Sequence, residues 1–276
     1  MTDTPDEAMA LLEAEDRDRA LSLVFAPQKV RADLAALYAV NVESARVRDQ
    51  VSQPMLGEIR LQWWRDTLTD EANSSSGNPV AAALLGSIHR HDLPRAAFDR
   101  FFEARIFDLY DDPMPDRAAF EAYAGETAST LIVLAATILS RSDADRIADA
   151  AGHAGVAQAV AGVLRLLPVH RARRQVYIPK DMLSAVGCST EELIAGSGEA
   201  PLRAVSAMVA FGREHAKAAH EHYAAVPASV RPAFLPALLA VPYLDRIERA
   251  GSDIFNRPVE IGPLSKSYRY WRSMRG

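Results

Sequence analysis

Apolar residues recur along most of this chain at intervals of three and four positions, the spacing that places them on one face of an α-helix. The alternation of apolar and polar residues that marks a half-buried strand never extends beyond a few positions. Proline or a small polar residue precedes several of the periodic segments, as at helix starts. The pattern predicts helices over residues 6–25, 27–51, 54–70, 80–90, 94–110, 116–139, 142–168, 201–225 and 232–250. We therefore predict an all-α fold.

Breaker-rich stretches separate these segments, and none is long enough to link two domains. Residues 71–79 contain three serines, a glycine and a proline and are predicted to form a surface loop. Shorter interruptions are predicted at residues 111–115, 171–181 and 196–201. Beyond Asp253 we expect the aromatic residues of the tail to pack back onto the bundle; they are Tyr268, Tyr270 and Trp271. The prediction is one domain over residues 1–276, with a short flexible N-terminus at about residues 1–6.

Composition narrows the class of protein. Of the 276 residues 49% are hydrophobic, which suffices for a buried core, and the net charge of −5 gives no electrostatic reason to expect a nucleic-acid partner. The single cysteine, Cys188, excludes an internal disulfide and a cysteine-built zinc site, and we expect an ordinary buried thiol. A reducing compartment is the simplest inference.

Two segments bear on localisation. The chain opens with acidic residues instead of a basic and then apolar stretch, so we expect no signal peptide. The longest apolar run, residues 131–139, is about half of the roughly 20 residues that a membrane span needs, and it is predicted to be a buried helix. We expect a cytoplasmic protein without a transmembrane helix, and peripheral contact with the inner membrane stays open.

The segment that says most about function covers residues 164–181. It ends in Arg-Arg-Gln-Val-Tyr-Ile-Pro-Lys-Asp, which resembles the Gly-Arg-Val-Tyr-Leu-Pro-x-Asp ending of the second signature of the squalene/phytoene synthase family. In that family the preceding helix carries an asparagine and two aspartates at four-residue spacing, which hold magnesium against a prenyl diphosphate. Aligned on Tyr177 and Pro179, these three positions hold Gly162, Leu166 and His170. None of them offers the oxygen ligand that magnesium prefers.

The first signature of that family has a counterpart in residues 36–49. Family members show Ala-Leu-Tyr-Ala-Phe-Cys-Arg-x-x-Asp-Asp-x-x-Asp, whereas this chain has Ala-Leu-Tyr-Ala-Val-Asn-Val-Glu-Ser-Ala-Arg-Val-Arg-Asp. The adjacent aspartates become Ala45 and Arg46, and only the last acid, Asp49, remains. A guanidinium about 4 Å from magnesium would cost roughly 8 kcal/mol of repulsion at an effective dielectric of about 20, as an upper estimate. Metal binding at both signatures is therefore expected to be lost together.

Further segments narrow the resemblance to one branch of the family. They are Asn41-Val-Glu-Ser-Ala-Arg-Val-Arg-Asp, Gly57-Glu-Ile-Arg-Leu-Gln-Trp-Trp-Arg-Asp, Leu166-Leu-Pro-Val-His-Arg and the closing Tyr270-Trp-Arg. They resemble the branch that contains mitochondrial assembly factors for respiratory complex I and their alphaproteobacterial relatives. The resemblance covers about residues 16–272 and implies an isoprenoid-synthase-like helical bundle with a central cavity.

The leading hypothesis is a non-catalytic squalene/phytoene synthase homologue that acts in the assembly of respiratory complex I (NADH:quinone oxidoreductase). Complex I subunits or assembly intermediates would be its partners. No catalytic residue, metal ligand or cofactor is expected under this hypothesis. Four residues are candidates for the wall of the cavity, as substrate-binding or structural groups: Tyr38, Arg46, Arg165 and Tyr177.

Two alternatives stay open. The chain could be an active prenyl-diphosphate condensing transferase, of the phytoene or squalene synthase type, with a rearranged magnesium site; its ligands would be Glu43 and Asp49, with Glu58 or Asp66 as a further one. It could also be a metal-independent protein that keeps the cavity for a lipid or isoprenoid. In that case Arg46, Arg165 and Arg173 would hold the headgroup.

Three other clusters have simpler interpretations. Asp108-Leu-Tyr-Asp-Asp112 resembles a metal motif, but it precedes two prolines, so we favour a solvated helix end. His215, His220 and His222 lack the i, i+4 spacing of a helical zinc pair and are expected on a solvated face. The basic run of Arg165, Arg171, Arg173, Arg174 and Lys180 is expected to be solvated, to bind anions or phospholipid headgroups, or to dock an acidic partner.

Overall fold

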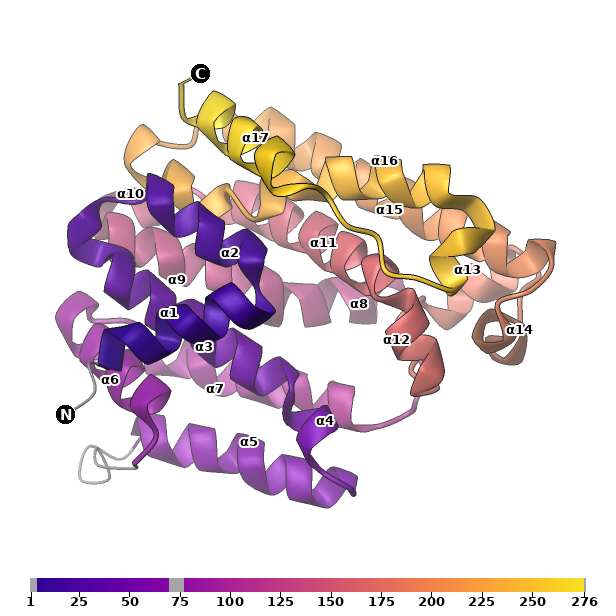
Figure 1. Cartoon of the computed structure of the whole chain (residues 1–276), viewed down its shortest axis with the longest axis horizontal. Helices are drawn as coiled ribbons and strands as arrows, with labels where there is room; N and C mark the ends of the chain where they lie inside the picture. Colours follow the sequence, from indigo (N-terminus) through magenta and orange to yellow (C-terminus); the bar gives the residue numbers. More distant parts are fainter. Residues whose placement is uncertain (1–3, 70–76, 276) are drawn as a thin grey trace.

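The computed structural model describes residues 4–69 and 77–275, and every regular element in these two ranges is helical (Figure 1). The α-helices are α1 (Thr4–Glu15), α2 (Arg17–Ser22), α3 (Arg31–Ala45), α4 (Val47–Gln50), α5 (Pro54–Thr69), α6 (Pro79–His91), α7 (Arg95–Arg105), α8 (Arg117–Ala124), α9 (Thr130–Leu139), α10 (Arg141–Ala144), α11 (Ala148–Arg165), α12 (Leu167–Ala172), α13 (Lys180–Ala185), α14 (Thr190–Ala195), α15 (Glu199–Tyr223), α16 (Ala240–Ala250) and α17 (Pro263–Arg275). Short 3-10 turns are η1 (Leu23–Phe25), η2 (Gln28–Val30), η4 (Ile106–Leu109), η6 (Ala228–Phe234), η7 (Ala237–Leu239) and η8 (Gly251–Phe255), and η5 (Gly125–Ser129) is a π-helical turn. The predicted all-α fold is confirmed.

Helix α11 runs through the interior of the bundle and belongs to both of its hydrophobic clusters (Figure 1). Its first half, with Ala151 and Ala154, packs in the cluster formed mainly by α1, α3, α5, α6, α7 and α9. Its second half, with Val160 and Leu164, packs in the cluster formed mainly by α8, α15 and α16. The small residues of α11 allow neighbouring helices to approach closely, and α11 therefore ties the two halves of the bundle together.

Several predicted helices are interrupted in the structure. The helix predicted over residues 6–25 breaks at Asp16, because the Asp16 side chain accepts a hydrogen bond from the backbone N–H of Arg19 at 3.1 Å and caps a new helix. The helix predicted over 142–168 becomes three, and Pro168 lies in the first turn of α12 instead of ending a helix. Helices α13 and α14 were missed, since each has only six residues and gives little periodicity.

The C-terminal tail forms a helix that the sequence pattern did not predict. Tyr270 on α17 is fully buried, whereas Tyr268 and Trp271 are exposed, so the expectation that all three aromatic side chains pack back was wrong for two of them. At the other end, α1 begins at Thr4, and the remainder of the flexible N-terminus predicted for residues 1–6 lies outside the described residues. Most of the predicted loop at 71–79 also lies outside them.

The apolar segment around α9 is longer than the sequence run suggested. Helices α8, η5 and α9 form one continuous stretch, Arg117–Leu139, that has the length and composition to cross a membrane. Half of its most apolar window is buried inside the bundle, and it packs against α11 and α7. A core helix of a globular protein has these same properties.

Candidate ligand cavity

A cavity of about 510 Å³ lies between α3, α11 and α12. Apolar side chains from α3, η5, α11 and α16 cover part of its wall, and the other part includes charged side chains of α2, α4 and η4 and that of Arg173, which follows α12. A space of this volume is in the range of small-molecule sites. The predicted central cavity is therefore present.

The two altered signature segments face each other across this cavity. Ala45 and Arg46, at the end of α3, line it from one side, and α11 and α12 supply the opposite wall with Gly162, Leu166 and His170. The positions that the family motif fills with magnesium ligands are thus brought together by the fold, although their chemistry differs. Gly162, Leu166 and His170, the positions chosen by the alignment on Tyr177 and Pro179, therefore line the same cavity as Ala45 and Arg46.

Three of the four predicted cavity residues lie in the wall: Arg46, Arg165 and Tyr177. Tyr38 does not, contrary to expectation, because it is 3% exposed and the guanidinium of Arg19 lies 5.5 Å from the centre of its ring, on the cavity side. Burial raises the pKa of Tyr38 to about 12. Its role in the described structure is to pack beneath Arg19.

Every carboxylate in the cavity wall is paired with a cationic side chain. Five acidic residues line the cavity, and their pairs are Glu15 with Arg46 at 3.2 Å, Asp16 with Arg19 at 2.6 Å, Asp18 with Lys266 at 2.5 Å, Asp49 with Arg173 at 2.6 Å and Asp108 with Arg105 at 3.0 Å. A divalent cation would have to displace these partners and would meet guanidinium groups at close range. The donor set therefore does not fit the magnesium ions that the family motif implies.

The rearranged magnesium site is not assembled either. Of its four predicted ligands only Asp49 reaches the cavity wall. Glu43 accepts a hydrogen bond from Asn78 at 3.2 Å, Glu58 accepts one from Tyr110, and Asp66 accepts one from Gln62 at 2.7 Å. These carboxylates point to separate neighbours, and no group of three acidic, histidine or cysteine side chains within the described ranges could hold a metal ion. That ligand prediction was wrong.

Asp108 is the centre of a buried hydrogen-bond network at the cavity. It is 7% exposed and accepts hydrogen bonds from the hydroxyl groups of Tyr123 at 2.8 Å and Tyr177 at 2.7 Å, beside its pair with Arg105. Arg105 also donates to the side-chain oxygen of Asn41 at 2.7 Å. The predicted solvated helix end was wrong for this residue. Burial and the Asp108 carboxylate both raise the pKa of Tyr123 and Tyr177, so both phenols stay protonated.

His170 contributes a neutral imidazole to the same wall. Burial lowers its pKa to about 4, so it carries no charge near neutral pH. Its ring centre lies 4.8 Å from that of Tyr177, and its Nδ1 atom is buried without a hydrogen-bond partner. The imidazole of His170 therefore adds no positive charge to this end of the cavity, where Arg173 also lies.

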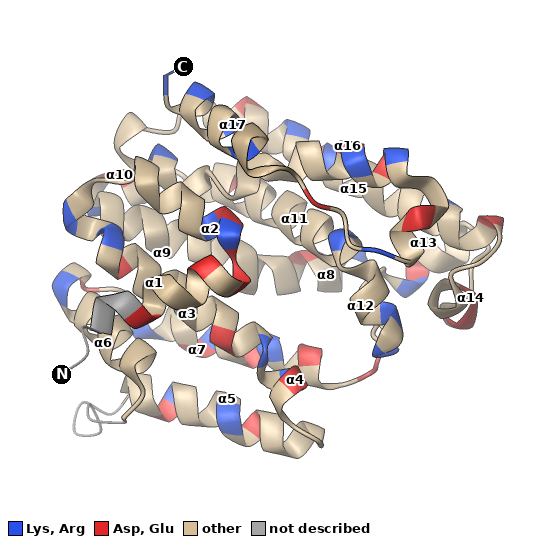
Figure 2. Ribbon diagram, viewed as in Figure 1, with Lys and Arg blue, Asp and Glu red and all other residues tan. Residues whose placement is uncertain are grey.

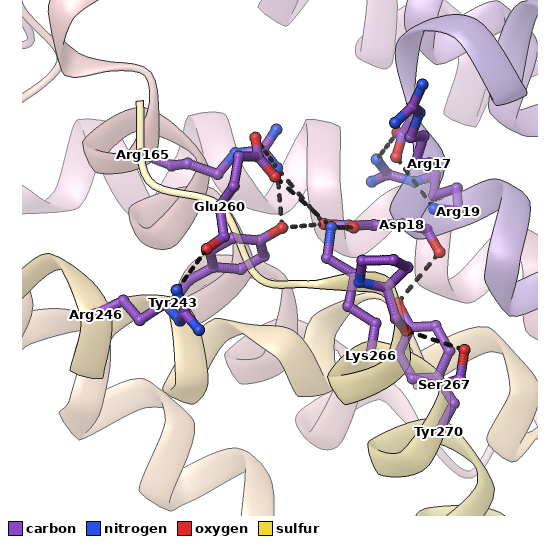
Figure 3. A network of polar contacts seen from close by, with 12 residues as sticks. Arg17, Asp18, Arg19, Arg165, Tyr243, Arg246, Glu260, Lys266, Ser267 and Tyr270 are labelled. Atoms are coloured by element: carbon purple, nitrogen blue, oxygen red, sulfur yellow. Dashed lines mark hydrogen bonds and ion pairs between the residues drawn. The ribbon is translucent and has the colours of Figure 1, made fainter. Parts of the chain in front are cut away.

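Arg165 belongs to a second network, at the edge of the cavity where the C-terminal segment crosses it (Figure 3). It donates to the hydroxyl of Tyr243 at 3.1 Å, and the Tyr243 hydroxyl donates to Asp18 at 2.8 Å. The pKa of Arg165 is raised. Burial alone would lower this pKa, but the nearby side chains of Tyr243, Glu260 and Asp18 raise it by more. Arg165 is held by protein partners and remains charged.

The predicted basic run does not form one patch. Arg165 and Arg173 enter the cavity wall, whereas Arg171 turns away and donates to the backbone carbonyls of Ile194 and Phe255. Arg171 therefore ties α14 and η8 to α12. The prediction of a single solvated or anion-binding run was wrong for Arg171, because buried carbonyl groups at helix ends need donors.

The histidine cluster also differs from expectation. His215 is 9% exposed; its Nδ1 lies 3.0 Å from Nδ1 of His153, and its Nε2 lies 3.3 Å from Glu121. Burial lowers the pKa of His215. The prediction of a solvated face was therefore wrong for His215 and correct for His220 and His222, which are exposed. Cys188 is buried as predicted, and burial raises its pKa.

An all-helical bundle with a cavity between two facing signature helices defines the class of isoprenoid-synthase-like proteins. A dehydrosqualene synthase structure superimposes with a TM-score of 0.82 at 15% identity, covering 99% of this chain and 95% of that one. A squalene synthase from Alicyclobacillus acidocaldarius gives a TM-score of 0.73 at 19% identity, covering 93% and 95%. At these identities the likeness concerns the fold. The sequence itself matches the squalene/phytoene synthase family over residues 12–265, and the chain belongs to that family.

Several relatives within the family are named as complex I assembly factors and not as synthases. The protein called NADH dehydrogenase (ubiquinone) complex I, assembly factor 6, from Rattus norvegicus is 32% identical over 272 residues, which cover 96% of this chain and 81% of the rat protein. The Homo sapiens protein of the same name is 31% identical, and the alignment covers 98% of this chain and 82% of the human protein. The similarity to these assembly factors therefore spans nearly the whole chain.

Proposed function

We propose that this protein is a non-catalytic member of the squalene/phytoene synthase family that acts in the assembly of respiratory complex I. One observation carries the loss of catalysis: the facing motif positions hold no oxygen ligand for magnesium, and each remaining cavity carboxylate is paired with a cation. Ionisation of a prenyl diphosphate needs divalent ions to neutralise the leaving group. A cavity without an available carboxylate does not supply that step.

The assembly role is supported by the similarity to complex I assembly factors over most of the chain. The structure supports a role without chemistry in one respect, because the cavity remains although its facing motif positions offer no oxygen ligand for magnesium. We infer that complex I subunits or assembly intermediates are the partners, and that a cytoplasmic protein reaches them at the membrane surface.

Deleting the gene should lower NADH:quinone oxidoreductase activity and the amount of assembled complex I, without changing carotenoid or hopanoid content. Complex I is measured by native gel electrophoresis and by NADH oxidation in membranes, with succinate oxidation as the control. In parallel, the purified protein with farnesyl diphosphate and magnesium should release no pyrophosphate above a heat-killed sample. Intact complex I in the deletion strain contradicts the assembly role, whereas pyrophosphate release contradicts only the loss of catalysis.

A second candidate function, metal-independent lipid or isoprenoid binding, is favoured by the retained cavity. Its wall combines apolar helix faces with Arg46 and Arg173, whose side chains are 41% and 34% exposed. Native mass spectrometry of protein purified from membranes should show a retained lipid. The matched variant is Gly162→Phe, because a Cβ at Gly162 meets no atom within 4 Å and the ring would enter the cavity. Wild-type protein without a bound lipid, or equal retention by the variant, contradicts this function.

A further inference from the structure

The C-terminal helix α17 is fixed to the bundle by one face. Lys266 and Tyr270 are 6% and 0% exposed; the Lys266 ammonium lies 2.5 Å from the Asp18 carboxylate, and the Tyr270 hydroxyl donates to the Asp18 backbone carbonyl at 3.2 Å (Figure 3). The Tyr270 ring packs edge-on against Phe25, with ring centres 5.9 Å apart. Because a buried ion pair and a buried phenol hold the same face, the helix cannot rotate to hide its other side.

The opposite face of α17 presents large apolar side chains to solvent. Leu264 is 85% exposed, Tyr268 is 59% exposed and Trp271 is 44% exposed. Their separations of four and three residues place them in one stripe along the helix. The Tyr268 and Trp271 rings are nearly parallel, with centres 6.1 Å apart, so they form one continuous aromatic surface. Exposed apolar residues are ordinary on a protein surface, but on α17 a leucine is aligned with two stacked aromatic rings.

The charges on α17 are all positive. Arg269, Arg272 and Arg275 are exposed, and residues 263–275 contain no acidic residue. The Arg275 guanidinium lies 4.1 Å from the centre of the Trp271 ring, which joins the charge to the stripe. Figure 2 shows the positive charges along this outer helix. Since the whole chain carries −5, this local excess is a property of α17 and not of the general composition.

We propose that α17 docks on the surface of an anionic phospholipid bilayer. Leucine, tryptophan and tyrosine on one side of a helix, with arginines beside them, suit the boundary between headgroups and acyl chains. Arginines near an anionic surface are attracted to lipid phosphate, and the aromatic rings enter the interface. Helix α17 lies on the outer edge of the bundle (Figure 1), and the side chains of its apolar stripe are exposed to solvent.

Vesicle flotation tests this surface. The full-length protein should float with vesicles of equal parts phosphatidylcholine and phosphatidylglycerol, and it should not float with phosphatidylcholine alone. Raising the salt concentration should weaken binding, because charge attraction to the surface is screened. The double variant L264S/W271S should lose affinity by about tenfold or more. Substituting R269Q and R272Q should reduce affinity by about fivefold for each arginine.

Matched controls show whether vesicle binding depends on α17 or on exposed apolar side chains in general. Met55 and Ile59 on α5 are 69% and 61% exposed, and the variant M55S/I59S should bind vesicles like the wild type. Thermal unfolding should be unchanged in all three variants, since every substituted side chain is exposed. The proposal is overturned if wild-type protein ignores anionic vesicles, if the α17 variants bind as well as wild type, or if the stripe instead drives self-association in sedimentation experiments. None of these outcomes depends on whether the protein assists complex I assembly.

Discussion

The variant Asp108→Ala is expected to lower the free energy of unfolding by about 3–5 kcal/mol, because it leaves a buried guanidinium without its counter-charge. The Arg105 side chain is only 13% exposed and pairs with Asp108 at 3.0 Å. The same substitution removes the acceptor of two phenol hydroxyls, those of Tyr123 and Tyr177. An unsatisfied buried hydroxyl costs roughly 1–3 kcal/mol unless water reaches it, and this cost is included in the expected loss of about 3–5 kcal/mol. Urea unfolding followed by circular dichroism measures the difference.

Two companion variants show whether the unpaired charge causes this loss. Asp112→Ala changes an exposed carboxylate four residues away and should alter stability by about 0.5 kcal/mol or less. The double variant Asp108→Leu with Arg105→Met should recover much of the lost stability, because an apolar pair can replace a buried ion pair. A loss below about 1 kcal/mol for Asp108→Ala would mean that the network is not the structural centre described above.

Residues of the cavity wall could be predicted from sequence only where the chain could be aligned with a family motif. The four-residue spacing predicted that Gly162, Leu166 and His170 share one face of a helix, and all three line the cavity even though the helix breaks at Leu166 between α11 and α12. Asp108 was missed because its partners lie far along the chain, 15 residues away at Tyr123 and 69 at Tyr177. A single sequence holds no signal that pairs such distant positions. The prolines at 113 and 115 predicted the helix end correctly but did not reveal that the end is buried.

Helix boundaries failed for local reasons. Asp16 interrupts a continuous apolar pattern because its side chain bonds to the backbone of Arg19, and periodicity does not register such a bond. The aromatic residues of α17 caused a different error, because burial was predicted for all of them and two are exposed. Aromatic side chains usually predict burial, and here Tyr270 is buried while Trp271, the next residue, points to solvent. The sequence pattern predicted the long helices of this bundle but missed α13, α14 and α17, and local capping bonds such as that of Asp16 set helix ends that periodicity does not show.

The altered charges of the cavity form a consistent set. Arg46, which replaces an expected metal ligand, pairs with Glu15, and the retained acid Asp49 pairs with Arg173 at 2.6 Å. A carboxylate left unpaired in a partly apolar cavity would be costly, and Arg46 and Arg173 supply the counter-charges. Under the proposed loss of magnesium binding, these two arginines would neutralise the cavity carboxylates in place of the metal and so stabilise the fold.

The variant Gly155→Ala should destabilise the bundle by about 3 kcal/mol, through a contact at the centre of the fold. Gly155 lies on α11 where that helix crosses the π-helical turn η5. A Cβ at Gly155 would lie 2.1 Å from the Ser129 Oγ atom, 2.5 Å from its backbone nitrogen and 2.6 Å from its Cα. A side-chain atom can move aside, but the backbone of η5 can yield only if α11 and η5 separate.

The matched substitution Gly162→Ala on the same helix should have the opposite sign. No atom lies within 4 Å of a Cβ at Gly162, so alanine gains helix propensity of about 0.5–1 kcal/mol without a clash. Thermal unfolding by calorimetry compares the two variants with wild type at equal concentration. Both changes add one methyl group to α11. The difference in stability between the two variants therefore measures the effect of the close contact between α11 and η5. Equal midpoints for the two variants would show that η5 can shift freely, and the π-helical turn would then not be fixed by the packing of α11.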